Sequence, residues 1–225
     1  MPRVLFVVLV VALGALVLTP AGEAQEPATT PKAATVGGRT FQGEELSADL
    51  PGGEQLKNVG SRKDGLGMCV MSSIEMAARW QGLEALRGLR DWCAREGGGA
   101  YPSKVDDQLK RFCAAQGVPL PRYVQAETGS PEEILELLDR TRRLACITYG
   151  TGERYAGRTI AHMTCCPKFS GRYGVCLDNN FPGDQSYEWM ARAELLRRIK
   201  HPAGRAWVFA WLDGAPPLPP FNRGP

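Results

Sequence analysis

Histidine is scarce in this chain: only His162 and His201 occur among 225 residues. The sequence also contains no Cys-x-x-Cys pair. Structural zinc sites draw their ligands from closely spaced Cys and His residues. Cys165 and Cys166 follow His162, but adjacent residues of a strand point to opposite faces of a sheet. We therefore expect no metal and no cofactor.

A strong imbalance of charge is also lacking. The 27 basic and 24 acidic residues give a net charge of +3 and are mixed along the chain. Nucleic-acid-binding domains have a much more basic surface, so we expect no nucleic acid partner. There is no internal repeat, and 44% hydrophobic residues are enough for one sizeable core.

Only one long hydrophobic run occurs, from Val4 to Leu18. About fifteen residues are too few for a typical membrane span. Arg3 precedes the run, and the small residues Gly22 and Ala24 follow it at the spacing of a cleavage site. We predict a signal peptide over residues 1–24, export to the periplasm, cell surface or medium, and no stable membrane span after cleavage.

The rest of the chain divides by composition into three parts. Residues 25–49 are rich in Pro, Thr, Ala and Gly and have no periodicity, which is typical of a flexible linker. Residues 50–213 carry the periodic segments of one domain. Residues 214–225 form a Pro-rich tail.

Helical periodicity comes first in the domain and strand-like runs follow. The helix ends are predicted from glycines that follow the periodic segments, from Ser103 as a cap, and from the capping box Ser130-Pro131-Glu132-Glu133. Glu75 and Arg79 read as an outward ion pair. This order predicts an α+β fold. The predicted helices are 68–81, 83–95, one that begins after Ser103 and ends before Gly117, one that begins at Pro131 and includes Leu138, and 191–200. The predicted strands are 144–149, 159–169, 173–178 and 206–212.

Cys69 follows the Gly-rich stretch 64–67 at the first turn of the predicted helix 68–81. A helix N-terminus favours a thiolate, which is the nucleophile of covalent acyl chemistry. Such a nucleophile needs a base and a group that orients the base. His162 on a later strand and the cluster Asp178-Asn179-Asn180 after the next strand supply both residue types.

These motifs, Gly67-Met68-Cys69, Ala161-His162-Met163 and Leu177-Asp178-Asn179-Asn180, resemble those of the papain-like cysteine peptidase superfamily, in its C39-like branch. The resemblance spans about residues 58–212. It implies a central helix bearing the Cys, packed on a C-terminal antiparallel sheet. It also implies a secreted hydrolase that cleaves peptide or amide bonds through a thioester, with a peptide or protein as substrate.

Strand register predicts the third catalytic residue. With a turn at Ser170-Gly171, His162 lies opposite Asn179, our first choice, with Asp178 as the alternative; a three-residue loop selects Asp178 or Asn180. The same register places Cys165 opposite Cys176, either as a disulfide or as two small buried residues. Seven cysteines in an exported protein also predict one free thiol, Cys69.

One part that the resemblance implies is missing. Papain-like enzymes place a Gln about six residues before the nucleophile, where it shares the oxyanion hole with the backbone N–H of the Cys. Lys63 stands at that position, so Lys63 or Asn58 is the candidate donor beside the Cys69 backbone. Loss of one such donor costs about 10²–10³ in rate. Two alternatives therefore stay open: an inactive binding module of the same fold, and amidase or transglutaminase-type acyl transfer.

Overall fold

The computed structural model describes residues 33–36, 39–42, 55–97, 99–181 and 187–215. The predicted signal peptide and nearly all of the Pro-rich tail lie outside the described residues. Within the predicted linker, β1 (Ala33–Val36) and β2 (Arg39–Gln42) pair as antiparallel strands, which the composition did not indicate. Among the described helices, none is long and apolar enough to cross a membrane.

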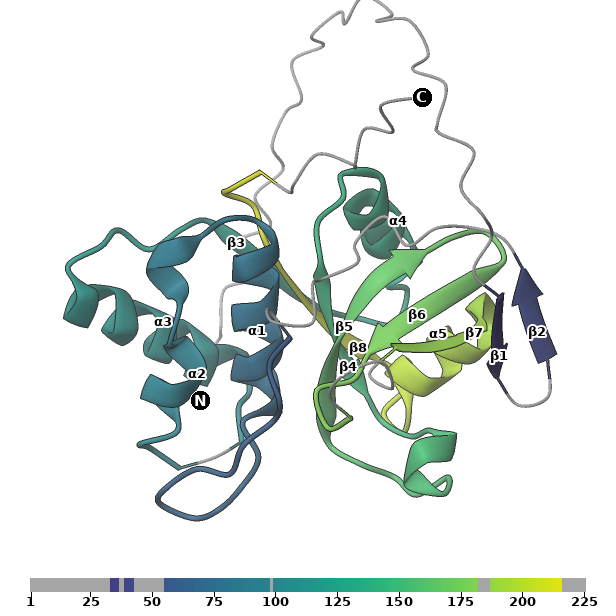
Figure 1. Cartoon of the computed structure of the whole chain (residues 1–225), viewed down its shortest axis with the longest axis horizontal. Coiled ribbons are helices and arrows are strands. Elements are labelled where there is room, and N and C mark those ends of the chain that lie inside the picture. The colour runs from purple at the N-terminus through teal and green to yellow at the C-terminus, as the bar shows by residue number, and fades with distance from the viewer. Residues whose placement is uncertain (1–32, 37–38, 43–54, 98, 182–186, 216–225) are drawn as a thin grey trace, which may run out of the picture. The chain divides into compact units, whose positions relative to one another are not determined.

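The predicted α+β class is confirmed: helices accompany a six-stranded antiparallel sheet with the order β3-β8-β4-β5-β6-β7 (Figure 1). Two of its strands, β3 and β7, were not predicted; β7 lies where the chain was expected to enter a helix. The bounds are β3 Tyr123–Thr128, β4 Ala145–Tyr149, β5 His162–Phe169, β6 Tyr173–Leu177, β7 Tyr187–Ala191 and β8 Ala206–Trp211.

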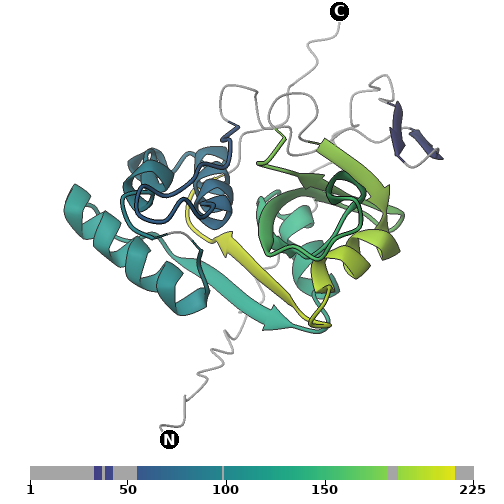
Figure 2. The same cartoon turned by 90° about the horizontal axis from the view of Figure 1, so that it is seen from below.

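Helices lie on both sides of this sheet (Figures 1 and 2). Helix α1 packs against β5, β4 and β8, and α2 and α3 continue on that side, whereas α4 and α5 pack against the sheet from the other side. The bounds are α1 Cys69–Trp80, α2 Leu89–Cys93, α3 Pro102–Gln116, α4 Glu132–Arg140 and α5 Arg192–Lys200, with short 3-10 turns η2 Glu84–Leu86 and η3 Glu153–Tyr155.

Several helix boundaries differ from the predicted ones, at positions where a glycine interrupts a helix or a proline begins one. The predicted helix 83–95 is divided into η2 and α2, because Gly88 adopts a left-handed φ of 88° between them. Helix α3 begins at Pro102 rather than after Ser103, since proline is well suited to the first helical turn. The Ser130 capping box does not form: α4 begins at Glu132 with Pro131 at the cap and no capping side-chain hydrogen bond.

The prediction of an outward Glu75–Arg79 pair is wrong in its direction. Glu75 is 1% exposed. Its carboxylate accepts hydrogen bonds from the backbone N–H groups of Gly88 (2.9 Å) and Arg90 (2.8 Å) as well as from Arg79. A carboxylate there satisfies the donors at the start of α2, so Glu75 joins α1 to α2.

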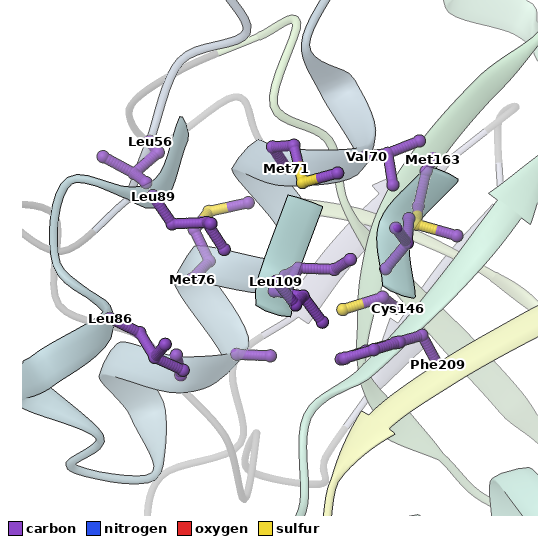
Figure 3. Packing of buried hydrophobic residues seen from close by; sticks show 14 of the residues in the cluster. Leu56, Val70, Met71, Met76, Leu86, Leu89, Leu109, Cys146, Met163 and Phe209 are labelled. Carbon is purple, nitrogen blue, oxygen red and sulfur yellow. The ribbon is translucent and has the colours of Figure 1, made fainter. Parts of the chain in front are cut away.

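Helix α1 is buried on almost every side. Met71, Ile74 and Ala77 are completely buried, in a core that includes Met163 and Phe209 of the sheet (Figure 3). A second core on the other side of the sheet brings α4 and α5 against β4, β5 and β8. Burial of α1 between α2 and α3 and the sheet gives the first residue of the helix a well-defined place.

The register of β5 and β6 differs from the predicted one. The turn is centred on Gly171-Arg172, because the Ser170 N–H donates to the Tyr173 carbonyl (2.9 Å). The register then shifts between Cys165 and Lys168, where β5 contains one extra residue. Pro167 lies in this bulge; proline has no N–H for a ladder and is found at bulges.

This bulge overturns the predicted pairing of Cys165 with Cys176. Cys165 lies opposite Leu177, and a shift of one residue turns Cys176 to the other face of the sheet. Cys165 belongs to the core under α1, and Cys176 to the core under α5. All seven cysteines are thiols in this structure.

Candidate active site

Cys69 is the first residue of α1 and is only partly buried. The chain that leads to it folds back on itself: the Met68 N–H donates to the Val59 carbonyl (2.9 Å), and Gly60 bridges Gly67. A side chain at Gly67 would clash, because its Cβ would lie 2.9 Å from Asn58 Nδ2. The glycine thus allows the loop to pass close to Asn58 and deliver Cys69 to the helix start.

His162 is the first residue of β5, opposite Tyr149 of β4, and is 7% exposed. Its ring is hydrogen-bonded to the Cys69 thiol. Its Nε2 lies 2.9 Å from Asp178 Oδ1. Because Asp178 accepts at Nε2, that nitrogen carries the proton and Nδ1 faces the thiol. The structure therefore brings Cys69 and His162 together, as the sequence predicted.

The third member of this chain of hydrogen bonds is Asp178, which is completely buried just after β6. Besides His162, its carboxylate accepts from the Asn180 backbone N–H (2.9 Å) and from the Tyr155 hydroxyl (2.8 Å). Both carboxylate oxygens are thus engaged, which holds Asp178 in one orientation against the imidazole.

The preference for Asn179 as the partner of His162 is wrong in this geometry. Asn179 Nδ2 lies within hydrogen-bonding distance of the Cys69 carbonyl (3.1 Å), the Ser73 hydroxyl (3.0 Å) and the Met163 carbonyl (3.0 Å). These three acceptors come from α1 and β5. Asn179 therefore fastens the Cys-bearing helix to the His-bearing strand, and the alternative, Asp178, contacts the ring.

Cys69 and His162 each favour the charged form of the other. Burial by itself raises the pKa of the Cys69 thiol, but the hydrogen bond and charge of His162, with the backbone N–H groups of Met163 and Val70, outweigh it and lower the pKa. Burial by itself lowers the pKa of His162, yet Asp178 and Cys69 raise it to about 9. Both shifts favour a thiolate beside an imidazolium, relative to an isolated thiol and an isolated imidazole.

The pKa of Asp178 is lowered although burial acts to raise it. The hydrogen bond and charge of His162, the Asn180 N–H and the Tyr155 hydroxyl overcome the cost of burial. The carboxylate stays ionised throughout the range in which His162 titrates, so it stabilises the protonated ring.

The three candidate donors to the oxyanion are the Cys69 N–H, Asn58 and Lys63, and they lie in different parts of the structure. The Cys69 N–H lies in the first turn of α1, where a helix offers its N–H groups no intrahelical acceptor. Asn58 is near the site: its N–H donates to the Asn179 carbonyl (2.7 Å), and its Nδ2 donates to Asn180 Oδ1 (2.8 Å). Lys63 is exposed in the preceding loop, with its Cδ beside Gly97.

A cavity of about 500 Å³ opens beside His162. Its walls come from the start of α3 and from the ends of β4, β5 and β8. They include Tyr101, Gly150, Ile160 and Trp207. A cavity of this size fits one or two side chains of a peptide, and His162 is the residue of the candidate catalytic group that lines it.

The network contains one residue that the sequence did not point to and one to which it gave a different role. Tyr155, on η3, places its ring 5.9 Å from the His162 ring and 5.7 Å from Phe181, between centroids. Asn180, considered only as a substitute orienter, donates through Nδ2 to the Tyr155 oxygen (2.9 Å). No local pattern marks Tyr155, since η3 is a single short turn; its adjacency to Asp178 arises in the tertiary structure.

His201, the other histidine, lines the same cavity as His162 but is not part of the Cys69–His162–Asp178 group. His201 Nε2 is hydrogen-bonded to the Thr159 hydroxyl (2.9 Å) at an exposed position. In the part of the chain that the structure describes, no three His, Cys, Asp or Glu side chains gather where they could hold a metal ion. Comparison of the chain with protein-family models, with curated proteins and with solved structures found no match.

Proposed function

We propose that this protein is a cysteine hydrolase that cleaves peptide or amide bonds, with Cys69 as nucleophile, His162 as general acid and base, and Asp178 as the group that orients the imidazole. The observation that carries the proposal is the continuous chain of hydrogen bonds from the Cys69 thiol through His162 to Asp178, beginning at a helix N-terminus. The motifs that resemble the C39-like branch of the papain-like superfamily contain these residues.

The geometry supports a two-step reaction. The Cys69 thiolate attacks the substrate carbonyl carbon, and the new oxyanion accepts a hydrogen bond from the Cys69 N–H. The C–N bond then breaks as His162 gives its proton to the leaving amine, which leaves a thioester. Water attacks the thioester while His162 takes a proton from it, and the C–S bond breaks to release the acid and regenerate the ion pair.

Asn58 is the better of the two predicted side-chain donors. It lies beside Gly67, two residues before the nucleophile, whereas Lys63 is on the exposed part of the loop. An Asn side chain carries two N–H donors, and the bond to Asn180 uses one of them. We assign the second to the oxyanion.

The substrate is proposed to lie in the cavity beside His162. A group held there is next to the residue that protonates the leaving amine. Together with the signal peptide that the sequence predicts, this favours a peptide or protein substrate met outside the cytoplasm.

Thiol reactivity tests the proposal without knowledge of the substrate. We expect iodoacetamide to alkylate Cys69 at pH 6 at least tenfold faster than glutathione, because an ion-paired thiolate persists where a simple thiol is protonated. The His162→Ala variant should lose this advantage. The matched control is His201→Ala, which removes the other histidine and should leave the rate unchanged.

Hydrolysis of a mixture of peptides and amides completes the test: Cys69→Ala should fold and show no cleavage. Full cleavage by Cys69→Ala, or alkylation at pH 6 no faster than that of glutathione, contradicts the proposal.

One observation favours a second candidate, a non-catalytic binding module of the same fold. The residue at the position of the expected oxyanion Gln is the exposed Lys63, and the Asn58 amide is already bonded to Asn180. Such a module cleaves no amide, and its binding function does not require Cys69 to react rapidly with iodoacetamide. If cleavage products instead carry an added amine, the reaction is acyl transfer of the transglutaminase type.

A further inference from the structure

Two cysteines face each other inside the sheet. Cys146 of β4 and Cys165 of β5 are directly opposite partners of an antiparallel pair, and both are completely buried. Opposite residues of such a pair have Cα atoms about 4.5–5.5 Å apart, within the range of about 4.4–6.8 Å that a disulfide spans. Figure 3 shows Cys146 among the side chains of the core that α1 covers.

The two thiols also share their surroundings. The Cys146 thiol is hydrogen-bonded to Cys165, and Cys165 Sγ lies 3.4 Å from the Ser73 carbonyl of α1. Burial, followed by the hydrogen bond and charge of Cys165, raises the pKa of Cys146. A buried neutral thiol is a poor nucleophile, so oxidation of this pair belongs to folding, before the core closes.

The neighbouring thiols have other contacts. On the opposite side of the sheet, Cys166 Sγ lies 3.4 Å from the Lys168 carbonyl, and Cys176 Sγ accepts a hydrogen bond from the Thr164 hydroxyl at 3.6 Å. These contacts direct each of the two sulfurs to a different partner. Cys146 and Cys165 are the two cysteines for which opposite strand positions and a thiol–thiol contact coincide.

We propose that Cys146 and Cys165 form a disulfide when the chain folds in an oxidising medium. The oxidant is another disulfide, of low molecular weight or on a folding catalyst. One cysteine thiolate attacks it and displaces a thiol, and the second thiolate attacks the mixed disulfide. The S–S bond of the protein forms, the oxidant's S–S bond breaks, and two electrons and two protons pass to two thiols.

The bridge joins the strand that begins with His162 to β4, beneath the helix that begins with Cys69. It stiffens the support of both residues while consuming neither. Cys69, partly exposed and at the helix start, keeps its thiol. This inference is independent of the proposed hydrolase activity, since a binding module of the same fold contains the same pair.

Peptide mapping tests the bridge. The full chain is refolded from denaturant in a mixture of reduced and oxidised glutathione, alkylated under denaturing conditions, and digested with trypsin. We expect the peptide 144–154, which holds Cys146, linked to the peptide 159–168, which holds Cys165 and Cys166. In the Cys166→Ser variant the same link should persist.

Two results overturn the proposal: recovery of Cys146 and Cys165 as alkylated thiols after oxidative refolding, or, in the Cys166→Ser variant, a link from 159–168 to 173–192, which holds Cys176. A melting measurement gives a second test. Refolded wild type should melt at a higher temperature than the same protein kept reduced throughout. The double variant Cys146→Ala, Cys165→Ala should show no such difference.

Discussion

Two buried charge clusters lie next to each other in this protein, and they differ in what their cations can do chemically. One contains Cys69, His162 and Asp178; the other contains Arg198 and Glu188. Each pairs a cation with a carboxylate and adds a tyrosine hydroxyl, and the rings of Tyr149 and Tyr155 meet at 6.3 Å between the clusters.

Arg198 is almost completely buried and has several hydrogen-bond acceptors around it. Arg198 donates to Glu188 (2.5 Å), Glu194 (2.5 Å) and the Tyr149 oxygen (2.8 Å), and Tyr149 in turn donates to Glu188 (2.8 Å). Burial alone lowers the pKa of Arg198, but these partners raise it overall. A guanidinium keeps its proton at every physiological pH, so this cluster can hold elements together but cannot transfer a proton.

The His162 cluster differs in two respects. Its cation can lose its proton, with a pKa of about 9, and one of its partners is a thiol at a partly exposed helix start. A buried ion pair is therefore weak evidence for catalysis by itself; a titratable base between a thiol and a cavity is stronger evidence. Each prediction below separates the two clusters or tests how they differ.

The largest expected effect is that of His162→Ala on cleavage. Loss of the base should lower kcat/KM by about 10²–10⁴, whereas Arg198→Met should leave kcat/KM of the folded protein within about threefold. Kinetics on a peptide substrate at pH 7, after circular dichroism has shown that each variant is folded, compares the two. Equal losses in both variants would mean that the clusters are not functionally distinct.

For the free energy of unfolding the order of the two variants should be reversed: Arg198→Met should lose more stability than His162→Ala. Arg198→Met leaves Glu188 buried without its cation, and breaking a buried pair in this way costs about 3–5 kcal/mol. Urea denaturation of the variant against wild type measures this cost. As control, Arg197→Met removes the neighbouring exposed arginine, which is paired with Glu194 at the surface, and should cost less than about 1 kcal/mol.

The pH profile should shift when Asp178 is replaced. In wild type, cleavage should fall as pH rises through about 9, because His162 then lacks the proton that the leaving amine needs. The hydrogen bond to Asp178 is the largest of the influences that raise this pKa. Asp178→Asn should therefore move the alkaline limb to lower pH, which the pH dependence of kcat/KM measures. An unchanged limb would show that Asp178 does not act on His162.

The same linkage predicts how stability depends on pH. The raised pKa of His162 contributes stability that is fully present below its unfolded value near 6.5 and is lost as pH rises through about 9. The lowered pKa of Asp178 contributes stability that is present above about 3.8 and is lost as pH falls through its folded value. The lowered pKa of Cys69 acts in the opposite direction to that of His162 below its unfolded value of 9.0 and offsets the alkaline decline in the wild type. The decline in unfolding free energy should therefore be seen in Cys69→Ala, where Asp178 still raises the pKa of His162, and His162→Gln in that background should flatten it.

The smallest expected effect is that of Tyr155→Phe. The ring beside His162 stays, and one hydrogen bond to Asp178 is lost, which costs about 1 kcal/mol. With fewer donors the pKa of Asp178 rises, so the stability that its ionised form provides should begin to decline at a higher pH as the solution is acidified. Denaturation curves between pH 3 and 6 would reveal this shift. Tyr149→Phe is the matching change in the other cluster and should leave the Asp178 titration in place.

The sequence by itself predicted most of the local elements and the two residues of the candidate Cys–His pair. Periodicity and glycine stops predicted α1 closely, because they express local conformational preference and the burial of one helix face. The position of Cys69 at a helix start and the scarcity of histidine led directly to the Cys69–His162 pair, which the structure brings together.

Tertiary structure alone decided the third residue and the cysteine neighbours. Asp178 rather than Asn179 meets His162, and Cys165 lies opposite Leu177 rather than Cys176, because β5 contains an extra residue at Pro167. The position of Cys146 opposite Cys165 follows from the separate register of β4 and β5. Side chains of a strand alternate with a period of two, so a shift of one residue reverses every facing relation beyond it. Pro167 is evident in the sequence. Whether β5 or β6 would contain the extra residue of a bulge was decided only by the pairing of the two strands in the folded sheet.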